Sequence, residues 1–200
     1  FRDATLELGP LTVLVGTNAS GKSNLRDAFR FIHGMSRGYN LAEIIGEKYG
    51  ESGVLQWKGI RGGTREVAYY GEESFEIETE LTIHHYSGET PTGIEDQMSH
   101  SITVHVPVGK GSPRVVCEKH QRFHRKNYNS HQIDDLPTQE GPGYLFVRLP
   151  RDEKNRKHGK RLRFLSSQPV LSQFDDHHEA RAIYRKPVQD YVKQLKSMRF

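Results

Sequence analysis

The sequence predicts an α/β fold in which a buried strand runs into a phosphate-binding loop and a helix runs out of it. Three observations support this. Residues 11–15 are an apolar, β-branched run after the Gly9-Pro10 turn, as expected of a strand covered on both faces. Residues 16–23 fit the pattern G-x-x-x-x-G-K-[ST] at every fixed position. Helical spacing follows at once, and later segments alternate as antiparallel strands do.

The loop at residues 16–23 has the composition of a phosphate site. Its small residues let backbone N–H groups converge, and a following helix adds partial positive charge at its N-terminus. Lys22 would reach the β- and γ-phosphates, and the Ser23 hydroxyl would bind the Mg²⁺ that bridges them. The expected nucleotide-binding residues are Gly16, Thr17, Asn18, Ala19, Ser20, Gly21, Lys22, Ser23 and Asn24. A structural glycine-rich turn is the alternative, and both flanks disfavour it.

The flanks of the loop are predicted in turn. Residues 5–8 indicate an incoming strand. After the loop, a helix with Gly34 as its C-terminal cap is predicted by apolar residues at i, i+3, i+4 and i+7, namely Leu25, Ala28, Phe29 and Ile32. A short helix over the nucleotide site is predicted by Leu41, Ile44 and Ile45, and Trp57 is expected to anchor the stretch around it.

The middle of the chain predicts a β-meander. Four antiparallel strands are expected at residues 75–83, 102–108, 114–118 and 144–147, with a polar loop at 88–99. In the first of them the glutamates Glu76, Glu78 and Glu80 alternate with apolar residues, which indicates a solvated acidic face. Near the end of the chain, a helix is expected at 175–184 and another behind Pro187 along an apolar stripe that reaches Met198.

The bulk composition limits the class of protein. The apolar fraction of 34%, the net charge of +4 and the mean hydropathy of −0.74 indicate one soluble domain with a modest core. No run of about 18 apolar residues and no signal peptide is present, so a cytoplasmic protein without a membrane partner is expected. Cys117 is alone, which excludes an internal disulfide. The chain begins without Met and its last apolar stripe reaches the end, so a fragment is expected.

The segment from Gly16 to Ile32 resembles the ABC-type ATPase heads of SMC, RecF-like and OLD-like proteins. The Asn of the loop and the run Ser23-Asn24-Leu25-x-Asp27-Ala28 carry the resemblance. It implies ATP and Mg²⁺ as ligands and an α/β N-terminal lobe that occupies residues 1–200. Within that lobe, the resemblance implies strand, loop and helix at 1–36, a β-rich subdomain with basic insertions at 37–165, and a glutamine-loop region with helices at 166–200.

The same resemblance places a glutamine loop at residues 166–173. Either Gln168 or Gln173 would then contact Mg²⁺ and the attacking water, and a plain polar loop residue is the alternative for each. The signature motif and catalytic glutamate of the family are not found in this chain. The nearest acids, Asp152 and Glu153, follow a run interrupted by Arg148 and Pro150, which indicates a surface turn. The guanine motif Asn-Lys-x-Asp is also missing, which favours adenine.

Two basic stretches, residues 119–126 and 151–163, are interleaved with aromatic residues and could follow the phosphates of DNA. Solvated hairpin tips are the alternative. The acidic and histidine-rich group at 175–179 is expected to cap a helix and not to bind a metal.

The resemblance implies Mg-dependent ATP hydrolysis after head-to-head homodimerisation. Hydrolysis would drive a conformational switch in DNA-associated repair or anti-phage defence, with an effector protein as a further partner. The 200-residue piece alone is expected to bind ATP without appreciable turnover. The alternatives are a small-molecule kinase and a nucleotide-dependent binding module that does not turn over.

Overall fold

The computed structural model describes residues 1–87, 89–126, 129–135, 138–141, 143–148, 161–174, 176–177 and 189–197. The helical elements are α1 (Lys22–Ser36), α2 (Leu41–Ile45), the 3-10 turn η1 (Gly63–Arg65) and α3 (Val170–Gln173). Residues 189–197 form a further helical segment. None of the helices in the described part of the chain has the length and apolar content needed to cross a membrane.

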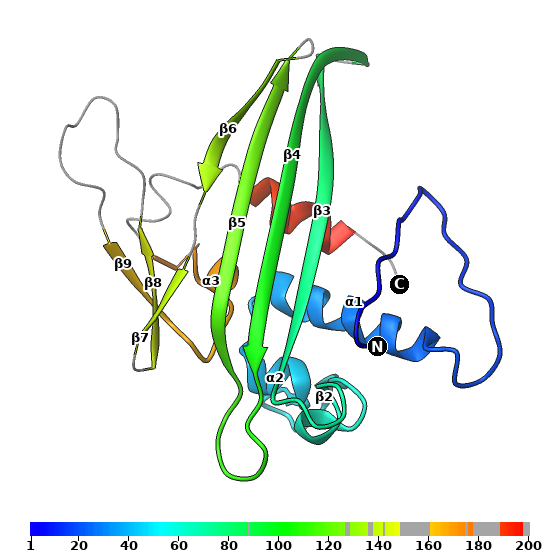
Figure 1. Ribbon diagram of the computed structural model, residues 1–200, viewed down its shortest axis with the longest axis vertical. Coiled ribbons are helices and arrows are strands. Elements are labelled where there is room, and N and C mark those ends of the chain that lie inside the picture. Colours follow the sequence, from blue (N-terminus) through cyan, green and yellow to red (C-terminus); the bar gives the residue numbers. More distant parts are fainter. Residues whose placement is uncertain are drawn as a thin grey trace.

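The strands form three antiparallel sheets (Figure 1). A two-stranded ribbon pairs β1 (Lys48–Tyr49) with β2 (Leu55–Trp57). The long sheet has the order β3-β4-β5-β6 and consists of β3 (Ser74–Ser87), β4 (Thr90–His105), β5 (Arg114–Lys126) and β6 (Asn129–Asp135). The small sheet has the order β7-β8-β9 and consists of β7 (Thr138–Gly141), β8 (Tyr144–Arg148) and β9 (Arg161–Leu165). Within each sheet, strands that follow one another in sequence pair with one another. The predicted meander is confirmed for its first three strands, which correspond to β3, β4 and β5, but the fourth, at 144–147, is β8 and belongs to the separate small sheet.

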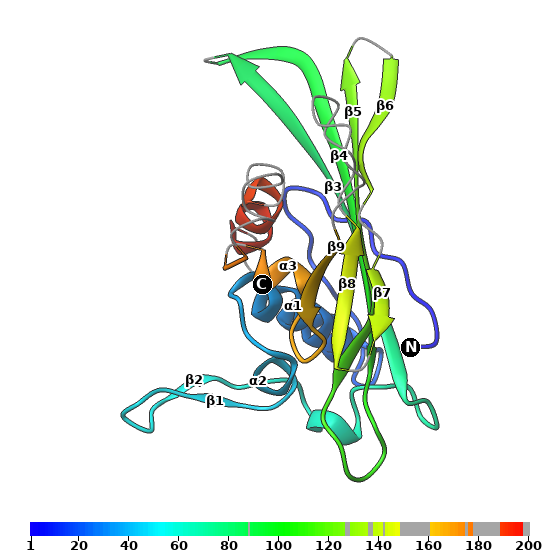
Figure 2. The same ribbon diagram turned by 90° about the vertical axis from the view of Figure 1, so that its left-hand side faces the viewer.

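The long sheet is amphipathic, as the alternation in the sequence predicts. Phe75 and Ile77 on β3 are partly buried against the core, while Glu76, Glu78 and Glu80 are exposed. Figure 2 shows α1, α3 and the helical segment 189–197 on one side of this sheet. That side is the inner face, and the glutamates lie on the outer face because successive residues of a strand point to opposite sides.

The core lies between this inner face and the helices. Phe31 of α1 is fully buried and meets Phe75 edge-on, with ring centroids 5.3 Å apart. Tyr191 and Leu195 of the segment 189–197 are also fully buried, which confirms the predicted apolar stripe for the described part of that helix. The predicted helix at 175–184 lies outside the described residues apart from 176 and 177.

The C-terminal end of α1 differs from the prediction. The helix runs to Ser36, and Gly34 lies inside it, buried against Ile44 and Trp57. The residue that stops the helix is Gly38, whose φ of 82° is left-handed. Its N–H donates to Met35 O at 3.0 Å, and Tyr39 N–H donates to Gly34 O at 3.2 Å, which is the Schellman pattern. The predicted cap at Gly34 is therefore wrong, because the capping glycine lies one turn later, at position 38.

The short helix predicted around Leu41 is confirmed as α2, with a capping box between Asn40 and Glu43. Its predicted place over the nucleotide site is wrong. Ile44 packs at Gly34, near the end of α1 remote from the loop. Trp57 is the expected anchor, since its indole N–H donates to Ile44 O at 3.1 Å.

Three segments adopt a secondary structure that differs from the predicted one. Residues 5–8 and 11–15 form no strand, and Leu11, Val13 and Val15 are 85%, 72% and 89% exposed. The physical reason is that no described strand pairs with them, so neither their hydrogen-bonding groups nor their side chains are covered. Residues 90–99, predicted as a polar loop, belong to β4 and pair with β3. That part of the hairpin is held by ladder hydrogen bonds, so it does not require the apolar alternation used to find strands.

Candidate functional site

The loop at residues 16–21 turns directly into the first turn of α1. Gly21 has a φ of 89° and Ala19 a φ of 65°, and both are left-handed. Gly21 O then accepts two N–H groups of the first helical turn, from Asn24 at 2.9 Å and Leu25 at 3.1 Å. Glycine at 21 allows this turn at little steric cost, so the local fold follows from the motif.

The Lys22 ammonium is folded back over the loop. Its Nζ donates to Gly16 O at 2.5 Å, Thr17 O at 2.5 Å and Ser20 Oγ at 3.1 Å. No carboxylate of the described residues pairs with it. All three acceptors are uncharged, and hydrogen bonds from an ammonium to phosphate oxygens are about twice as strong as neutral ones. Residues 16–20 are exposed, so an anion can reach this ammonium from solvent.

Of the predicted loop residues, Gly16, Thr17 and Ser20 contact that ammonium. A Cβ at Gly16 would lie 2.8 Å from Ser20 Oγ, so glycine at 16 lets the Ser20 hydroxyl lie close to the backbone without turning away. Gly21 is covered by the ring of Phe1, because a Cβ at 21 would lie 2.1 Å from Phe1 Cζ. Ser23 is partly buried in the first helical turn, and its hydroxyl makes no hydrogen bond within the described part of the chain.

A charged cluster lies one turn further along α1. Asp27 is 7% exposed and accepts a hydrogen bond from Arg61 Nε at 2.8 Å. The same guanidinium donates through Nη2 to Asn24 Oδ1 at 3.0 Å, and Arg30 donates to Gly59 O at 3.0 Å. The segment after β2 is thus tied to the first two turns of α1.

Arg61 is the residue of this cluster that the sequence did not reveal. It stands before Gly62 and Gly63, both of which have positive φ, in a stretch without periodicity. The one available signal was Asp27 itself. An acidic residue on a helix face that is otherwise apolar needs a partner when it is buried. The sequence does not say which of several arginines provides it.

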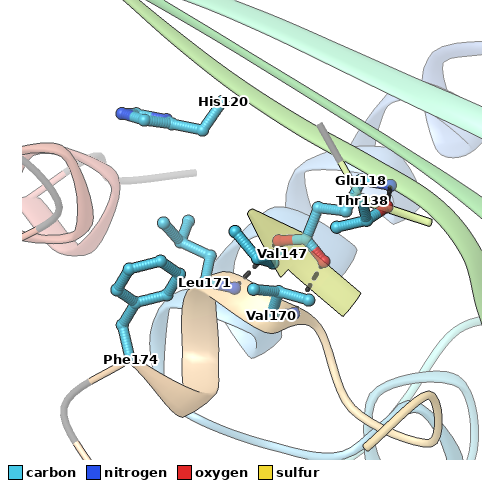
Figure 3. Close-up of a pocket in the computed structure, with 7 residues that line it drawn as sticks. All are labelled: Glu118, His120, Thr138, Val147, Val170, Leu171 and Phe174. Atoms are coloured by element: carbon cyan, nitrogen blue, oxygen red, sulfur yellow. Dashed lines mark hydrogen bonds between the residues drawn. The ribbon is translucent and has the colours of Figure 1, made fainter. Parts of the chain in front are cut away.

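A second polar cluster is buried between the long sheet and α3 (Figure 3). Glu118 on β5 is 3% exposed, and its carboxylate accepts hydrogen bonds from Val170 N at 2.6 Å and Leu171 N at 2.9 Å. Its Oε1 also lies 3.0 Å from His100 Nε2 on β4. The carboxylate therefore satisfies the first N–H groups of α3, which have no partner inside the helix.

His120 lies beside this cluster without a partner. It is 5% exposed, and neither ring nitrogen makes a hydrogen bond to a described residue. Burial, with smaller contributions from His100 and Arg122, lowers the pKa of His120 to about 3. Tyr191 packs against it, with ring centroids 5.4 Å apart, and its hydroxyl contacts that of Thr79. Burial also raises the pKa of Tyr191. The side chains of Glu118, His100, His120 and Tyr191 are therefore as buried as those of the structural core.

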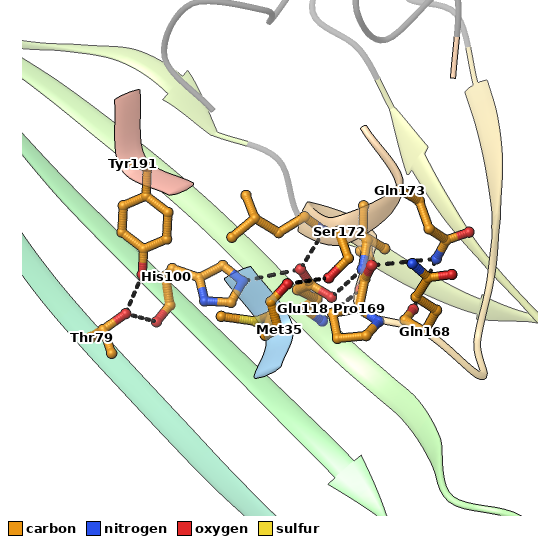
Figure 4. Close-up of polar contacts among 12 residues, drawn as sticks. Met35, Thr79, His100, Glu118, Gln168, Pro169, Ser172, Gln173 and Tyr191 are labelled. Atoms are coloured by element: carbon orange, nitrogen blue, oxygen red, sulfur yellow. Dashed lines mark hydrogen bonds and ion pairs between the residues drawn. The ribbon is translucent and has the colours of Figure 1, made fainter. Parts of the chain in front are cut away.

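The two candidate glutamines lie next to each other at α3, as Figure 4 shows, and neither makes a hydrogen bond to a described residue of the loop. Gln168 Nε2 donates to Gly38 O at 3.0 Å, and Gln173 bonds to Leu165 through its N–H and its carbonyl at 2.9 Å each. Gly38 follows the far end of α1, about 22 Å from Ser23 at 1.5 Å of rise per residue. In this arrangement both glutamines close the 165–173 turn, so a contact with Mg²⁺ at Ser23 gains no support.

The basic stretch 119–126 is not one surface. Strand alternation places Lys119 outside and buries His120, and Arg122 donates to the buried Asp96 at 2.7 Å. The side chains of 124–126 and all of 151–160 lie outside the described residues. The DNA interface expected at 119–126 therefore loses its continuity. In the second stretch, Arg161 and Arg163 are exposed on β9.

No cluster of three His, Cys, Asp or Glu residues that could hold a metal occurs in the described part of the chain. Most of the 175–179 group falls outside the described residues. Ser23 remains the described residue with the chemistry to assist a magnesium ion, since Mg²⁺ takes few protein ligands and keeps waters and substrate phosphate oxygens.

Comparison with known proteins identifies one family. Residues 11–184 match the family described as "AAA domain, putative AbiEii toxin, Type IV TA system". The match begins at the apolar run before the loop and extends past α3. No curated protein and no solved structure matches the chain significantly.

Proposed function

Since the chain belongs to this family of AAA domains and carries an ABC-type P-loop ATPase head, we propose that it binds Mg-ATP at residues 16–24 and hydrolyses it. The observation that carries the proposal is the Lys22 ammonium. It lies at the N-terminus of a helix, in an exposed loop, with only uncharged acceptors around it. A phosphate that enters the loop replaces those acceptors with charged oxygens.

Each residue of the loop and of the first turns of α1 has its own role in this proposal. Lys22 binds the β- and γ-phosphates, and the glycines at 16 and 21 let the backbone approach them closely. The Ser23 hydroxyl, which has no other described partner, would hold Mg²⁺, which supplies charge neutralisation between the same phosphates. Asn24 and Asp27 fix the first turns of the helix through Arg61.

We further propose that turnover requires a second copy of the head. Within the described residues, Asp27 is the nearest acid along α1 to the loop, and Arg61 already engages it, so it is not available to activate water. The exposed apolar residues Leu11, Val13 and Val15 next to the loop favour a covering partner. Hydrolysis would then act as a conformational switch. The description of the matched family favours a role in defence, acting through an effector protein.

The first test is Lys22→Ala, with ATP binding measured by calorimetry. Removing the ammonium is expected to abolish detectable binding, a loss of at least about 100-fold, because the charge-assisted bonds to two phosphates are lost. Lys110→Ala, an exposed lysine in the β4–β5 turn, is the matched control and should leave the affinity unchanged. The thermal midpoint of both variants should equal that of the parent, since Lys22 contacts only its own loop. Unchanged ATP affinity in Lys22→Ala would overturn the proposal.

The second measurement is the rate of phosphate release per chain as the chain concentration rises. A head that turns over as a dimer gives a rate per chain that increases with concentration and then saturates. Binding without turnover at every concentration would overturn the proposal that two copies of this chain suffice. It would agree with the expectation that these 200 residues bind ATP without appreciable turnover, and a nucleotide-dependent binding module would give the same result. Phosphate transfer to an added small hydroxyl compound would identify a kinase.

A further inference from the structure

Strand β3 forms an edge of the long sheet, as Figure 1 shows. The sheet order is β3-β4-β5-β6, so one side of β3 pairs with β4 and the other side pairs with no described strand. The two strands keep one register without a bulge from Ser74, opposite His105, to His84, opposite Glu95. A long, regular edge presents a row of backbone groups with which another extended segment can pair.

The backbone groups at the open edge belong to the even-numbered residues of β3. Val106 N–H donates to Glu73 O at 2.7 Å, so this pair, which continues the register by one step, is hydrogen-bonded. In an antiparallel ladder, bonded pairs alternate with pairs that do not bond. The N–H and C=O groups of Glu76, Glu78 and Glu80 therefore point away from β4. No backbone hydrogen bond reaches them from another residue that the structure describes.

The inner face of β3 is less well covered than that of β4. Ile77 and Leu81 are only partly buried. The residues opposite them on β4, Ile102 and Met98, are at most 2% exposed. Paired residues share a face of the sheet, but β4 has a strand on each side and β3 has a described one on one side only. An added strand with apolar side chains on this face would bury the area that remains exposed.

The outer face of the same edge is acidic. Glu76, Glu78 and Glu80 are exposed and form no ion pair with another described residue. The residues opposite them on β4 are serine or threonine. Two copies of β3 side by side would bring like charges together, so the acidic row disfavours pairing of this edge with itself. It favours a strand that carries basic side chains on that face.

We propose that the open edge of β3 binds an extended segment of another protein by antiparallel strand addition, and that this segment alternates basic and apolar residues. Its basic side chains lie opposite the three glutamates, and its apolar side chains cover Ile77 and Leu81. The basic residues also make the backbone hydrogen bonds to the edge, because bonded pairs and outer-face residues recur with the same period of two. The proposal does not depend on nucleotide binding at Lys22.

The first test uses the full chain and a fluorescent nine-residue peptide that alternates lysine and valine, with binding measured by anisotropy at low salt. The variant Glu76→Gln/Glu78→Gln keeps the side-chain shape and removes two charges. It is expected to bind at least about 5-fold more weakly, since two opposite-charge pairs across the strands are lost. The matched control Glu51→Gln/Glu66→Gln removes two exposed charges outside β3 and should bind as the parent does.

Two methylated peptides separate strand pairing from charge attraction. N-methyl groups on the lysines remove the donors that face β3, so binding should weaken by at least about 50-fold. N-methyl groups on the valines point away from β3 and should leave the affinity within about 3-fold of that of the unmethylated peptide.

Hydrogen exchange locates the contact on the chain. With the unmethylated peptide bound, the amides of Glu76, Glu78 and Glu80 should exchange at least about 10-fold more slowly. The amide of Ile77 faces β4 already and should change little.

The outcomes decide the proposal in both directions. Binding that depends on Glu76 and Glu78 and on the lysine N–H groups supports it. No detectable binding, equal affinity of the parent and the Glu76→Gln/Glu78→Gln variant, or equal affinity of the two methylated peptides overturns it. Slow exchange of the Glu78 amide in the free chain also overturns it, and would assign the edge to residues 1–8 or to a second copy. All arms are measured without nucleotide, so failure of ATP binding at Lys22 leaves the result unchanged.

Discussion

The two halves of α1 lie in contrasting surroundings. Its N-terminal turns carry the phosphate loop, with Lys22 bonded to its own loop and an exposed run before it at 11–15. Its C-terminal turns hold Phe31 and Met35 in the core and are tied to the 166–173 segment by Ser172, which donates to Met35 O at 2.8 Å. The proposed phosphate-binding residues lie at the open, exposed N-terminal end of α1, and the core contacts that stabilise the fold lie at its buried C-terminal end. Mutations at the two ends should therefore have separable effects.

The largest loss of stability is expected at the buried end, for Glu118→Ala. The change leaves Val170 N, Leu171 N and His100 without their common acceptor, and losing one partner of a buried polar network costs about 3–5 kcal/mol. Urea unfolding measures this free energy. Glu78→Ala, on the exposed outer face, should change it by less than about 0.5 kcal/mol. Equal losses in the two variants would remove the contrast between buried and exposed carboxylates.

A pH-dependent loss is expected from His120, and at pH 5 it is smaller than that of Glu118→Ala, at about 2 kcal/mol. Its pKa is about 3 in the folded chain and 6.5 in the unfolded one, so below pH 6.5 the unfolded state gains a proton that the native state does not. Stability should therefore decrease as the pH falls from 6.5 towards 3, by about 1.4 kcal/mol per unit. His120→Phe should remove this part of the dependence. Parallel unfolding profiles against pH in the parent and His120→Phe would contradict the assignment.

The smallest effect is expected at the open end, for Val13→Thr. The residue is 72% exposed, so exchanging a methyl for a hydroxyl should change the free energy of unfolding by less than about 0.5 kcal/mol. Calorimetric melting of the two chains side by side provides the comparison. A loss above about 1.5 kcal/mol would place Val13 in a buried strand and would make the two ends of α1 alike.

The prediction of the fold from the sequence succeeded where the pattern is local. The loop and α1 follow from residues 16–32, and β3 follows from strict alternation that includes Glu76 and Glu78. The strands β6, β7 and β9 were not predicted, because β9 shows its alternation in only two buried residues, Leu162 and Phe164, and β6 and β7 are strongly polar in composition. For the same reason residues 90–99 were predicted as a loop.

The sequence predicts the contacts within the motif better than those beyond it. The residues around Lys22 Nζ are contiguous in sequence, so local geometry sufficed. Gln168 and Gln173 were assigned by order along the chain, and order does not determine distance; both lie at the far end of α1. Arg61 reaches Asn24 and Asp27 across more than thirty residues, and no local pattern encodes that contact.

The C-terminal end of α1, which the Schellman turn at Gly38 closes, is held more firmly than its N-terminal end. The C-terminal end packs in the core, and Gln168 and Ser172 donate hydrogen bonds to Gly38 O and Met35 O. The N-terminal end, which follows the phosphate loop, is held mainly by the contact of Arg61 with Asp27. If a helix about 22 Å long tilts by about 5° around its C-terminal end, its N-terminal end moves by about 2 Å. A rigid tilt of that size, started by an adjustment of α3 or of the 166–173 turn, would move Lys22 by the length of a hydrogen bond.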